Sequence, residues 1–570
     1  MPRRLLSLVA AALLAAGACS SSATPAPTSP PSTAPTSASA TAAAPSAAQA
    51  TAGASSAGGG TVAGTSITIT RLAEITPQFH PLNGQSNQYM LFYLVFDNLV
   101  KLDTSDPALQ TIVPDLADSW QISPDGTTFT FHLHPGVMWQ DGTAFTAQDV
   151  VYTATWGAEN FAQYQGFPPA WNYLQGAAAA AGTTKAVAGV TAPDPNTVVF
   201  KLAAPNAYFL RDLADAPNAI MPQHILNGMS ATQILAGSFI KSPIGTGPYK
   251  FASINPGQDI EFDANPNYFL GAPKIAKIFY KYETPDSALS DIQAGSLDLL
   301  LDGPPSEATT LASAPNVQIF KVPSPGIVSL TAQDDNPRWA NPLVRQAMYY
   351  GIDRRGIVAS VLQGNAKVLI GPPGFKEYSD LNTYPYDVAK AKALLQQANF
   401  DFSKPVKLIW STDWPDNSAV VPVIVQQLDA LGMNVVSEPL ASDPWTALVT
   451  DPTKRSTFDL DISTGGSEGL GPDRSQLYYL CNQPVGVSIG YENCDMINLF
   501  NKAATIIDPT ARDAVYHQLA LIFNSQVPQL YLWSPLGIQV ASKRLGGGFK
   551  GVPSFSRYVT MNAATWSVSQ

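Results

Sequence analysis

Cysteine and histidine are both scarce in this sequence. Its 570 residues include three cysteines and five histidines, and the histidines are scattered along the chain. His132 and His134 share one face of an expected strand, but no third metal ligand lies near them in the sequence. A protein metal site needs several ligands close together, so the sequence predicts no metal centre. It also has no glycine-rich phosphate loop, and we expect no cofactor and no ATP hydrolysis by this chain.

Basic residues are few and do not form a tract. The chain carries 32 Lys and Arg against 43 Asp and Glu, which gives a formal net charge of -11 and a sequence pI of about 4.9. Proteins that bind nucleic acids neutralise phosphates with clustered Lys and Arg. We therefore expect no nucleic-acid partner.

The amino terminus has the pattern of a processing signal. Arg3 and Arg4 precede an apolar run at 5–16, which is too short to span a bilayer as a mature helix. Small residues then lead to Cys19, in a pattern similar to the cleavage site of bacterial lipoproteins. We expect a lipoprotein signal peptide at 1–18 and a lipid on Cys19. Ordinary secretory cleavage, with an incidental Cys19, is the alternative.

The next segment is of low complexity. Residues 20–64 are almost wholly Ser, Ala, Thr, Pro and Gly. This composition buries too little apolar surface to offset the cost of ordering the chain. We expect residues 19–64 to form a disordered tether that holds a soluble body near a membrane. A lipid on Cys19 would place that body at the outer face of the bacterial cytoplasmic membrane.

The other two cysteines lie near each other in the sequence. Cys481 and Cys494 are 13 positions apart in the turn-rich stretch CNQPVGVSIGYENC. An exported protein meets an oxidising compartment, where such a pair forms a disulfide that stabilises by roughly 3 kcal/mol. A zinc site is the alternative, although no histidine lies nearby.

The hydrophobic pattern predicts a mixed α/β protein. In the second half of the chain, expected strands alternate with amphipathic helices, which indicates parallel-rich sheets covered by helices. Thr146 and Asp149 have the spacing of a capping box that opens a helix at Ala147. The expected strands include 65–71, 196–202, 259–269, 274–283, 406–411, 434–440, 458–464 and 529–535. The expected helices include 88–100, 147–156, 344–352, 388–400, 419–432, 496–507 and 511–526.

One short motif raises the possibility of an enzyme. Residues 465–469 read GGSEG, which fits the Gly-x-Ser-x-Gly elbow of a serine hydrolase around Ser467. An elbow needs a helix directly after the serine, but two further glycines and Pro472 oppose a helix there. The one downstream histidine, His517, lies inside an expected helix. The motif therefore favours a loop, and a secreted serine hydrolase using Ser467 is kept as an alternative.

Eight motifs follow one another in a recognisable order. The most specific is PDLADSWQISPDGTTFTFHLHPGVMWQDGTAFTAQDVVY at 114–152. The others are 245–251 with 265–269, 294–298, 344–354, 384–395, 426–435, 490–503 and 527–533. Together they resemble the extracellular solute-binding proteins of ABC importers, family 5, which includes dipeptide and oligopeptide binders. The resemblance covers nearly everything from about 66 to 560.

The resemblance implies a particular α/β architecture. The family has the large form of the periplasmic-binding-protein fold, with two lobes joined by a hinge and an extra subdomain on the first lobe. Carried over, lobe one would hold 66–323 together with the returning tail 537–570. The extra subdomain would lie at about 111–240. Lobe two would hold 324–536.

The resemblance also implies binding instead of catalysis. The protein would capture a small solute, in first place a peptide, and deliver it to permease subunits that work with a separate ATPase. The same fold binding an oligosaccharide, a metal chelate or haem is an alternative. A receptor or sensor without transport is another. We expect a monomer that works outside the cytoplasm.

A ligand-binding loop is expected after a lobe-two strand. Relatives carry an Asp-Tyr-x-Asp-Pro-like run there, whose first Asp pairs with the amino group of a peptide. When Pro472 anchors the comparison, Glu468 takes the place of that Asp, while glycines replace the Tyr and the second Asp. Gly466, Ser467 and Glu468 are therefore expected to line the cleft. Amine binding by Glu468 and a merely solvated carboxylate both remain open.

Five further residues complete the expected site. Trp414 and Trp445 follow strands, where open α/β sheets bind ligands, and their rings offer stacking surface; ordinary packing is the alternative. Gln333 takes the place of an Asn that approaches the ligand backbone in relatives. Asn87 and Tyr89 precede the first helix and are expected to face the cleft from lobe one.

Overall fold

A computed structural model gives the fold of most of the chain. It describes residues 64–71, 79–80, 89–160, 170–183, 187–324, 326–334, 336–414, 416–465, 472, 491–552 and 558–569. Residues 1–56 and 57–570 form separate units, and the architecture below is that of the second unit. The predicted signal peptide and all but the last residue of the predicted tether lie outside the described residues. Within the described part, no helix combines the length and apolar character needed to cross a membrane.

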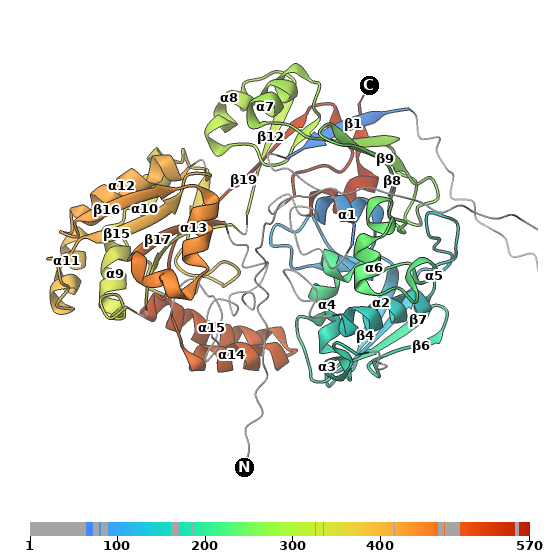
Figure 1. Ribbon diagram of the computed structural model, residues 1–570, viewed down its shortest axis with the longest axis horizontal. Coiled ribbons are helices and arrows are strands. Elements are labelled where there is room, and N and C mark those ends of the chain that lie inside the picture. Colours follow the sequence, from blue (N-terminus) through green and yellow to red (C-terminus); the bar gives the residue numbers. More distant parts are fainter. Residues whose placement is uncertain are drawn as a thin grey trace, which may run out of the picture. The chain divides into compact units, whose positions relative to one another are not determined.

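A seven-stranded sheet gathers segments from both ends and the middle of the chain (Figure 1). Its order is β12-β19-β11-β1-β10-β9-β8, with β1 parallel to β10 and β11 and the other neighbours antiparallel. Its strands are β1 (Ser66–Thr70), β8 (Tyr249–Asn255), β9 (Asp259–Ala264), β10 (Lys277–Lys281), β11 (Leu299–Leu300), β12 (Val317–Val322) and β19 (Gly537–Ser542). Helices α7 (Pro285–Ala294) and α8 (Ala308–Ala312) connect strands of this sheet.

A four-stranded antiparallel sheet lies between β1 and β8 in the sequence. Its order is β4-β5-β7-β6, and its strands are β4 (Ala117–Ile122), β5 (Thr128–Leu133), β6 (Val190–Asp194) and β7 (Thr197–Lys201). Helix α2 (Ala147–Glu159) begins at the predicted residue, and Thr146 and Asp149 form the predicted capping box. The remaining elements of this part are β2 (Val100–Leu102), β3 (Ile112–Pro114), α3 (Ala177–Ala180), α4 (Phe209–Leu213), α5 (Gln223–Leu226) and α6 (Ala231–Ala236).

Helix α1 (Tyr89–Val95) is completely buried and shorter than its apolar sequence predicts. The predicted helix reached residue 100, but the chain leaves the helix after Val95. The carbonyl oxygen of Val95 accepts a hydrogen bond from the main-chain N–H of Gly247 over 2.8 Å. A Cβ atom on Gly245 would lie 1.8 Å from the same oxygen. The GTG motif therefore lacks side chains because its backbone packs directly on the end of α1.

A six-stranded sheet forms the centre of the second half of the chain. Its order is β14-β18-β13-β17-β15-β16, in which β15 is parallel to β16 and β17. Its strands are β13 (Ile327–Ala332), β14 (Ala366–Val368), β15 (Val406–Ser411), β16 (Val435–Leu440), β17 (Leu460–Gly465) and β18 (Leu530–Pro535).

Helices cover both faces of this sheet. One face packs its apolar side chains against α9 (Pro342–Gly351), α10 (Arg354–Ser360), α11 (Val388–Gln397) and α12 (Asn417–Asp429). Helix α13 (Ser442–Val449) packs on the other face, where Val449 contacts Ile409 of β15. Helices α14 (Cys494–Thr505) and α15 (Pro509–Gln526) pack against each other through a separate apolar cluster. The alternation of strands and helices predicted from the sequence is confirmed for this half.

The chain passes twice between the six-stranded and the seven-stranded sheet. The first crossing segment, 322–327, joins β12 to β13, and the second, 535–537, joins β18 to β19. The two run side by side, because β12 pairs with β19 and β13 pairs with β18. The two largest hydrophobic clusters lie on either side of these crossings, one around the seven- and four-stranded sheets and one around the six-stranded sheet. The carboxyl-terminal residues include a last short pair, β20 (Leu545–Gly546) and β21 (Ser567–Val568).

Candidate functional site

The carboxyl ends of β15, β16 and β17 meet at one edge of the six-stranded sheet, because these strands are parallel. Hydrogen bonds join the segments at the ends of β15 and β16. The N–H of Thr412 donates to the carbonyl oxygen of Leu440 over 2.8 Å, and the N–H of Ser442 donates to Asp413 Oδ2 over 3.0 Å. Trp414 and Trp445 lie in these neighbouring segments. The structure thus brings the two predicted aromatic residues to the same edge.

Trp414 presents an unused hydrogen-bond donor at this edge. Its ring is half-buried, and its indole Nε1 is buried without a hydrogen-bond partner among the described residues. Asp416, two positions later, is the N-cap residue of α12, yet its carboxylate makes no capping bond to that helix. Burial raises the pKa of Asp416. A buried, unpaired donor and a partly desolvated carboxyl group therefore lie close together in the sequence at the end of β15.

Trp445 is fixed by a buried carboxylate that the sequence analysis missed. Its Nε1 donates to Asp461 Oδ1 over 2.6 Å, and the hydroxyl of Ser463 donates to the other carboxylate oxygen. Asp461 is 1% exposed, and this burial raises the pKa of its carboxyl group to about 6. A signal was present, because FDLDIST places a charged residue among alternating apolar positions of an expected buried strand.

The predicted ligand loop begins where β17 ends. Gly465 is the last residue of β17, at the same edge as Trp414 and Trp445. Gly466, Ser467 and Glu468 lie outside the described residues, so their roles stay predictions. His517, the predicted partner of a hydrolytic Ser467, lies within α15. Its Nε2 is 2.9 Å from Asp380 Oδ1, and its ring stacks on Tyr378 with 4.2 Å between centroids.

Two other predicted contacts, Gln333 and Tyr89, are not brought to this edge. Gln333 follows β13, which runs antiparallel to β17, and its N–H donates to the carbonyl oxygen of Asp459 at the opposite end of that strand. Tyr89 is the first residue of α1 and is buried in the core around the seven-stranded sheet. Asn87 lies outside the described residues. A contact of any of these three with a ligand stays a prediction.

One of the two predicted disulfide cysteines is described. Cys494 begins α14 and is disulfide-bonded. Cys481 lies outside the described residues, as does Cys19. The pairing of Cys481 with Cys494 and the lipid on Cys19 therefore stay predictions.

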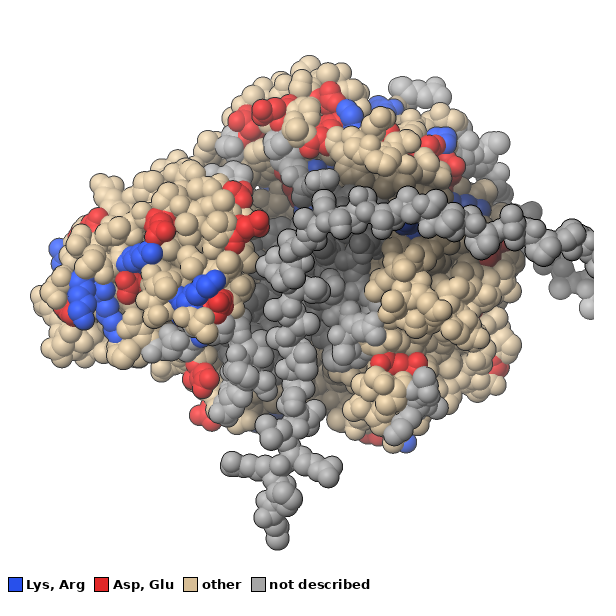
Figure 2. Space-filling model, viewed as in Figure 1, with Lys and Arg blue, Asp and Glu red and all other residues tan. Residues whose placement is uncertain are grey.

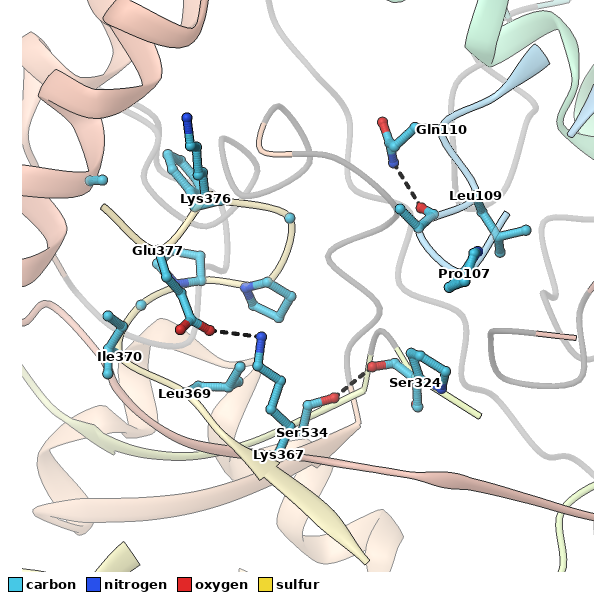
Figure 3. Close-up of a pocket in the computed structure, with 18 of the residues that line it drawn as sticks. Pro107, Leu109, Gln110, Ser324, Lys367, Leu369, Ile370, Lys376, Glu377 and Ser534 are labelled. Atoms are coloured by element: carbon cyan, nitrogen blue, oxygen red, sulfur yellow. Dashed lines mark hydrogen bonds and ion pairs between the residues drawn. The ribbon is translucent and has the colours of Figure 1, made fainter. Parts of the chain in front are cut away.

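A cavity of about 470 Å³ lies beside the crossing segments (Figure 3). One wall is 107–110, from the loop between β2 and β3, and the other is Lys367 with 369–377, from the segment that follows β14. Ser324 and Ser534 lie between the two walls. The cavity is thus lined by segments from both sides of the crossings.

Most of the cavity wall is apolar. Leu369, Ile370 and Phe375 line one side and Pro107 and Leu109 the other. Leu109 is fully buried and has a φ angle of 50°, a left-handed backbone that a bulky residue rarely adopts. The sequence analysis did not select these residues. The run GPPG at 371–374 was an available signal, since two prolines between glycines indicate a stiff loop.

One ion pair lies at the mouth of the cavity. Lys367 Nζ lies 2.7 Å from Glu377 Oε1 at the cavity, and both side chains are exposed. On the face drawn in Figure 2, Lys and Arg are scattered among Asp and Glu and form no continuous basic band. Among the described residues, no group of three or more His, Cys, Asp or Glu is arranged to hold a metal ion.

Comparison with known proteins assigns this architecture. Residues 111–487 match the family described as bacterial extracellular solute-binding proteins, family 5 middle. A protein of Brucella ovis named as an ABC transporter peptide-binding protein is 28% identical over 458 residues, which are 77% of this chain and 82% of that protein.

Solved structures share the fold. The substrate-binding protein CtaP of an ABC transporter of Listeria monocytogenes superposes with a TM-score of 0.78 at 22% identity, over 89% of this chain and 100% of that chain. The oligopeptide-binding protein AppA of Bacillus subtilis, in complex with a nonapeptide, gives 0.70 at 22% identity, over 89% and 99%. The predicted two-lobed periplasmic-binding-protein fold is confirmed. The chain therefore belongs to family 5 of the bacterial extracellular solute-binding proteins, the extracytoplasmic and non-enzymatic binding components of ABC importers.

Proposed function

We propose that this chain is a lipid-anchored peptide-binding protein that delivers its ligand to the permease of an ABC importer. The observation that carries the proposal is the cavity beside the crossing segments, whose two walls come from opposite sides of those crossings. Its volume of about 470 Å³ suits a few residues of an extended solute. The peptide-binding relatives support a peptide as the solute.

The crossing segments provide the hinge in this proposal. Lobe one comprises 66–323 and 537–570, with the extra subdomain at about 111–240, and lobe two comprises 324–536. A solute that contacts both walls of the cavity favours the arrangement in which the walls are close, since a ligand shifts an equilibrium toward the state it binds better. Closure then presents the loaded protein to the permease. The family membership removes the serine hydrolase from the alternatives.

The ligand in this proposal extends from the cavity toward the edge at which β15, β16 and β17 end. The apolar wall at Leu369 and Ile370 receives a side chain, because burial of apolar surface is favourable and non-directional. At the sheet edge, the carboxyl groups of Asp416 and Glu468 attract an amine. The rings of Trp414 and Trp445 contribute stacking surface.

The anchor is tested separately from the binding. We propose that Cys19 carries the lipid, that 19–64 is the tether, and that the monomeric binding lobes work at the outer face of the cytoplasmic membrane. Cys19→Ser should be released in soluble form and should still bind ligand, whereas Ser20→Ala should stay in the membrane fraction. A Cys19→Ser protein that remains in the membrane fraction would disprove the lipid anchor.

The identity of the solute is tested by mass. Protein purified without denaturation should carry small molecules whose fragmentation gives amino-acid residue masses, and calorimetry with synthetic peptides of the same composition should reproduce the binding. Release of an oligosaccharide, a metal chelate or haem instead would replace the peptide while leaving the binding role intact. The gene for the protein can also be deleted. If the protein binds the solute but the deletion strain imports that solute normally, the protein is a sensor instead of a transport component.

A further inference from the structure

Asp461 lies on a face of the six-stranded sheet that carries an unusual band of buried polar groups. Successive strand residues point to opposite faces, so Leu460 and Ile462 face α9–α12 while Asp461 faces the other way. Its Cα partners are Thr331 on β13 and Ile409 on β15. Thr331 is 1% exposed, as is Ser329 beside it, and both accept hydrogen bonds from Gln529. The carboxylate therefore sits among neutral polar groups inside the sheet face.

The described residues give this carboxylate hydrogen bonds but no ion pair. Trp445 Nε1 and the hydroxyl of Ser463 are its two donors. The charged groups on the adjoining elements have other partners: Lys407 pairs with Glu438 over 2.8 Å, and Asp413 accepts the N–H of Ser442. Asp443, in the first turn of α13, is also acidic and is exposed. A buried carboxylate held by two donors forms strong, short bonds to them, because its charge is not screened by water.

Trp445 is the partner through which this carboxylate can affect the binding edge. The tryptophan is in the first turns of α13, directly after β16, and part of its ring remains exposed. The buried part packs against Ile409, Val449 and Phe458. Apolar packing alone restricts where the ring lies but leaves its rotation about the side-chain bonds less defined. The bond of 2.6 Å to Asp461 fixes which edge of the indole points inward.

We propose that Asp461 is a positioning residue for solute binding: it holds the indole of Trp445 so that the outer face of the ring contacts an apolar or aromatic side chain of the bound peptide. This inference rests on the proposed peptide-binding function and adds to it a preference for peptides that carry an apolar or aromatic side chain. The preference follows from geometry, since a ring held by its N–H keeps its π-face free for stacking and cannot offer that N–H to the ligand.

The test pairs two substitutions with a spectroscopic signature. Asp461→Asn keeps the size of the side chain and an acceptor oxygen but removes the charge, and Trp445→Phe keeps an aromatic ring but removes the donor. In the ¹⁵N–¹H spectrum of the tryptophan indoles, the Trp445 signal is the one that Trp445→Phe deletes. It should move upfield in Asp461→Asn, because the bond to a neutral oxygen is weaker.

Binding is then measured with the tripeptides Ala-Phe-Ala and Ala-Ala-Ala. Asp461→Asn should weaken binding of Ala-Phe-Ala by about threefold to tenfold, the effect of one charge-assisted bond lost in part, and that of Ala-Ala-Ala by less than about twofold. The double variant should bind no more weakly than Trp445→Phe alone, since both act through one contact. The matched control is Trp410→Phe. The indole of Trp410 donates to Ser437 Oγ, on the neighbouring strand, over 2.9 Å. The ratio of the affinities of this variant for the two peptides should equal that of the parent.

The outcomes separate this inference from the function on which it rests. If the parent binds neither tripeptide nor any other peptide, the proposed function fails, while the indole spectrum still reports the bond. If the parent binds peptides and Asp461→Asn lowers both affinities equally, or leaves the indole signal in place, the positioning role is wrong. If Asp461→Asn does not fold, Trp445→Phe provides the test. The proposal requires that this variant, too, loses the preference for Ala-Phe-Ala over Ala-Ala-Ala.

Discussion

The hydroxyl of Ser534 donates a hydrogen bond of 2.5 Å to the carbonyl oxygen of Ser324. Ser534 precedes the crossing segment 535–537, and Ser324 lies within 322–327, so this bond joins the two places at which the chain passes between the sheets. Both residues also line the cavity. The structure therefore places the cavity directly against both crossing segments. If these segments act as the proposed hinge, ligand binding in the cavity and the arrangement of the lobes should be coupled.

Ligand binding is expected to reduce the radius of gyration. The walls of the cavity come from opposite sides of the crossing segments, so a bound peptide favours the arrangement in which both walls touch it. Small-angle X-ray scattering of the protein, first stripped of co-purified solute and then saturated with peptide, measures the change. Identical scattering profiles in the two states would contradict a hinge mechanism.

Filling the cavity should abolish binding without unfolding the protein. Ile370 is half-buried and lines the cavity, so the larger side chain of Ile370→Trp would occupy space that the solute needs. We expect affinity for peptide to fall by at least about tenfold, with a melting temperature close to that of the parent. Leu270→Trp is the control, because Leu270 is 46% exposed and does not line the cavity. Parental affinity in Ile370→Trp would place the solute elsewhere.

The pairing of Cys481 with Cys494 can be tested by mass. Cys494 is disulfide-bonded, and Cys481 is the cysteine predicted to be its partner. Digestion without reduction should yield the two linked peptides. Cys494→Ser should lower the free energy of unfolding by roughly 3 kcal/mol, because it releases a closed loop in the unfolded chain. Detection of a link between Cys494 and Cys19, or of two free thiols at 481 and 494, would refute this pairing.

Asp461 should make the stability depend on pH in a particular direction. Burial raises the pKa of its carboxyl group to about 6, whereas an unfolded Asp has a pKa of about 3.9. Between these values the folded state binds more protons than the unfolded state, so the contribution of Asp461 is most favourable below about pH 4 and is lost as the pH rises through 6. The difference corresponds to about 3 kcal/mol.

The measurement compares the parent with Asp461→Asn, which cannot ionise. Urea unfolding at pH 4 and pH 7 should show the variant gaining stability relative to the parent at the higher pH by about 2 kcal/mol, while the other carboxyl groups cancel in the comparison. A relative stability that does not change between the two pH values would mean that Asp461 titrates like an exposed carboxylate.

Local elements of the fold could be predicted where their determinants are close in the sequence. The capping box at Thr146 and Asp149 gave the start of α2, because both partners lie within one turn. The end of α1 could not be predicted, since it depends on Gly245 and Gly247, which are about 150 positions away and pack on the carbonyl oxygen of Val95. The apolar run simply continues past that point.

The residues of the candidate site also divide into those that the local sequence predicts and those that depend on long-range strand pairing. Trp414 and Trp445 were predicted from the rule that ligands bind where parallel strands end, and that rule needs only the local order of strand and loop. Gln333 also follows a strand, but β13 is antiparallel to its neighbour, so it lies at the other end of the sheet. Strand direction within a sheet is set by long-range pairing. Asp461 was missed for the related reason that alternation does not reveal whether the second face of a strand is covered.

The last prediction concerns the loop that follows β17. Gly465 is the last residue of β17, at the same sheet edge as the segments of Trp414 and Trp445, and Glu468 follows three residues later in the sequence. If its carboxylate pairs with a ligand amine out of water, removal of the charge costs a few kcal/mol, whereas loss of a solvated carboxylate costs almost nothing. Glu468→Gln should therefore weaken binding of a peptide with a free amino terminus by at least about tenfold.

The same peptide with an acetylated amino terminus should bind parent and variant alike. Ser467→Ala is the matched control and should have a mild effect, since a hydroxyl supplies at most one neutral bond. Calorimetry on the three proteins decides the matter. Equal affinities of parent and Glu468→Gln for the free-amine peptide would rule out this loop as the amine anchor, and binding would then depend on the aromatic and apolar surfaces at Trp414, Trp445 and the cavity.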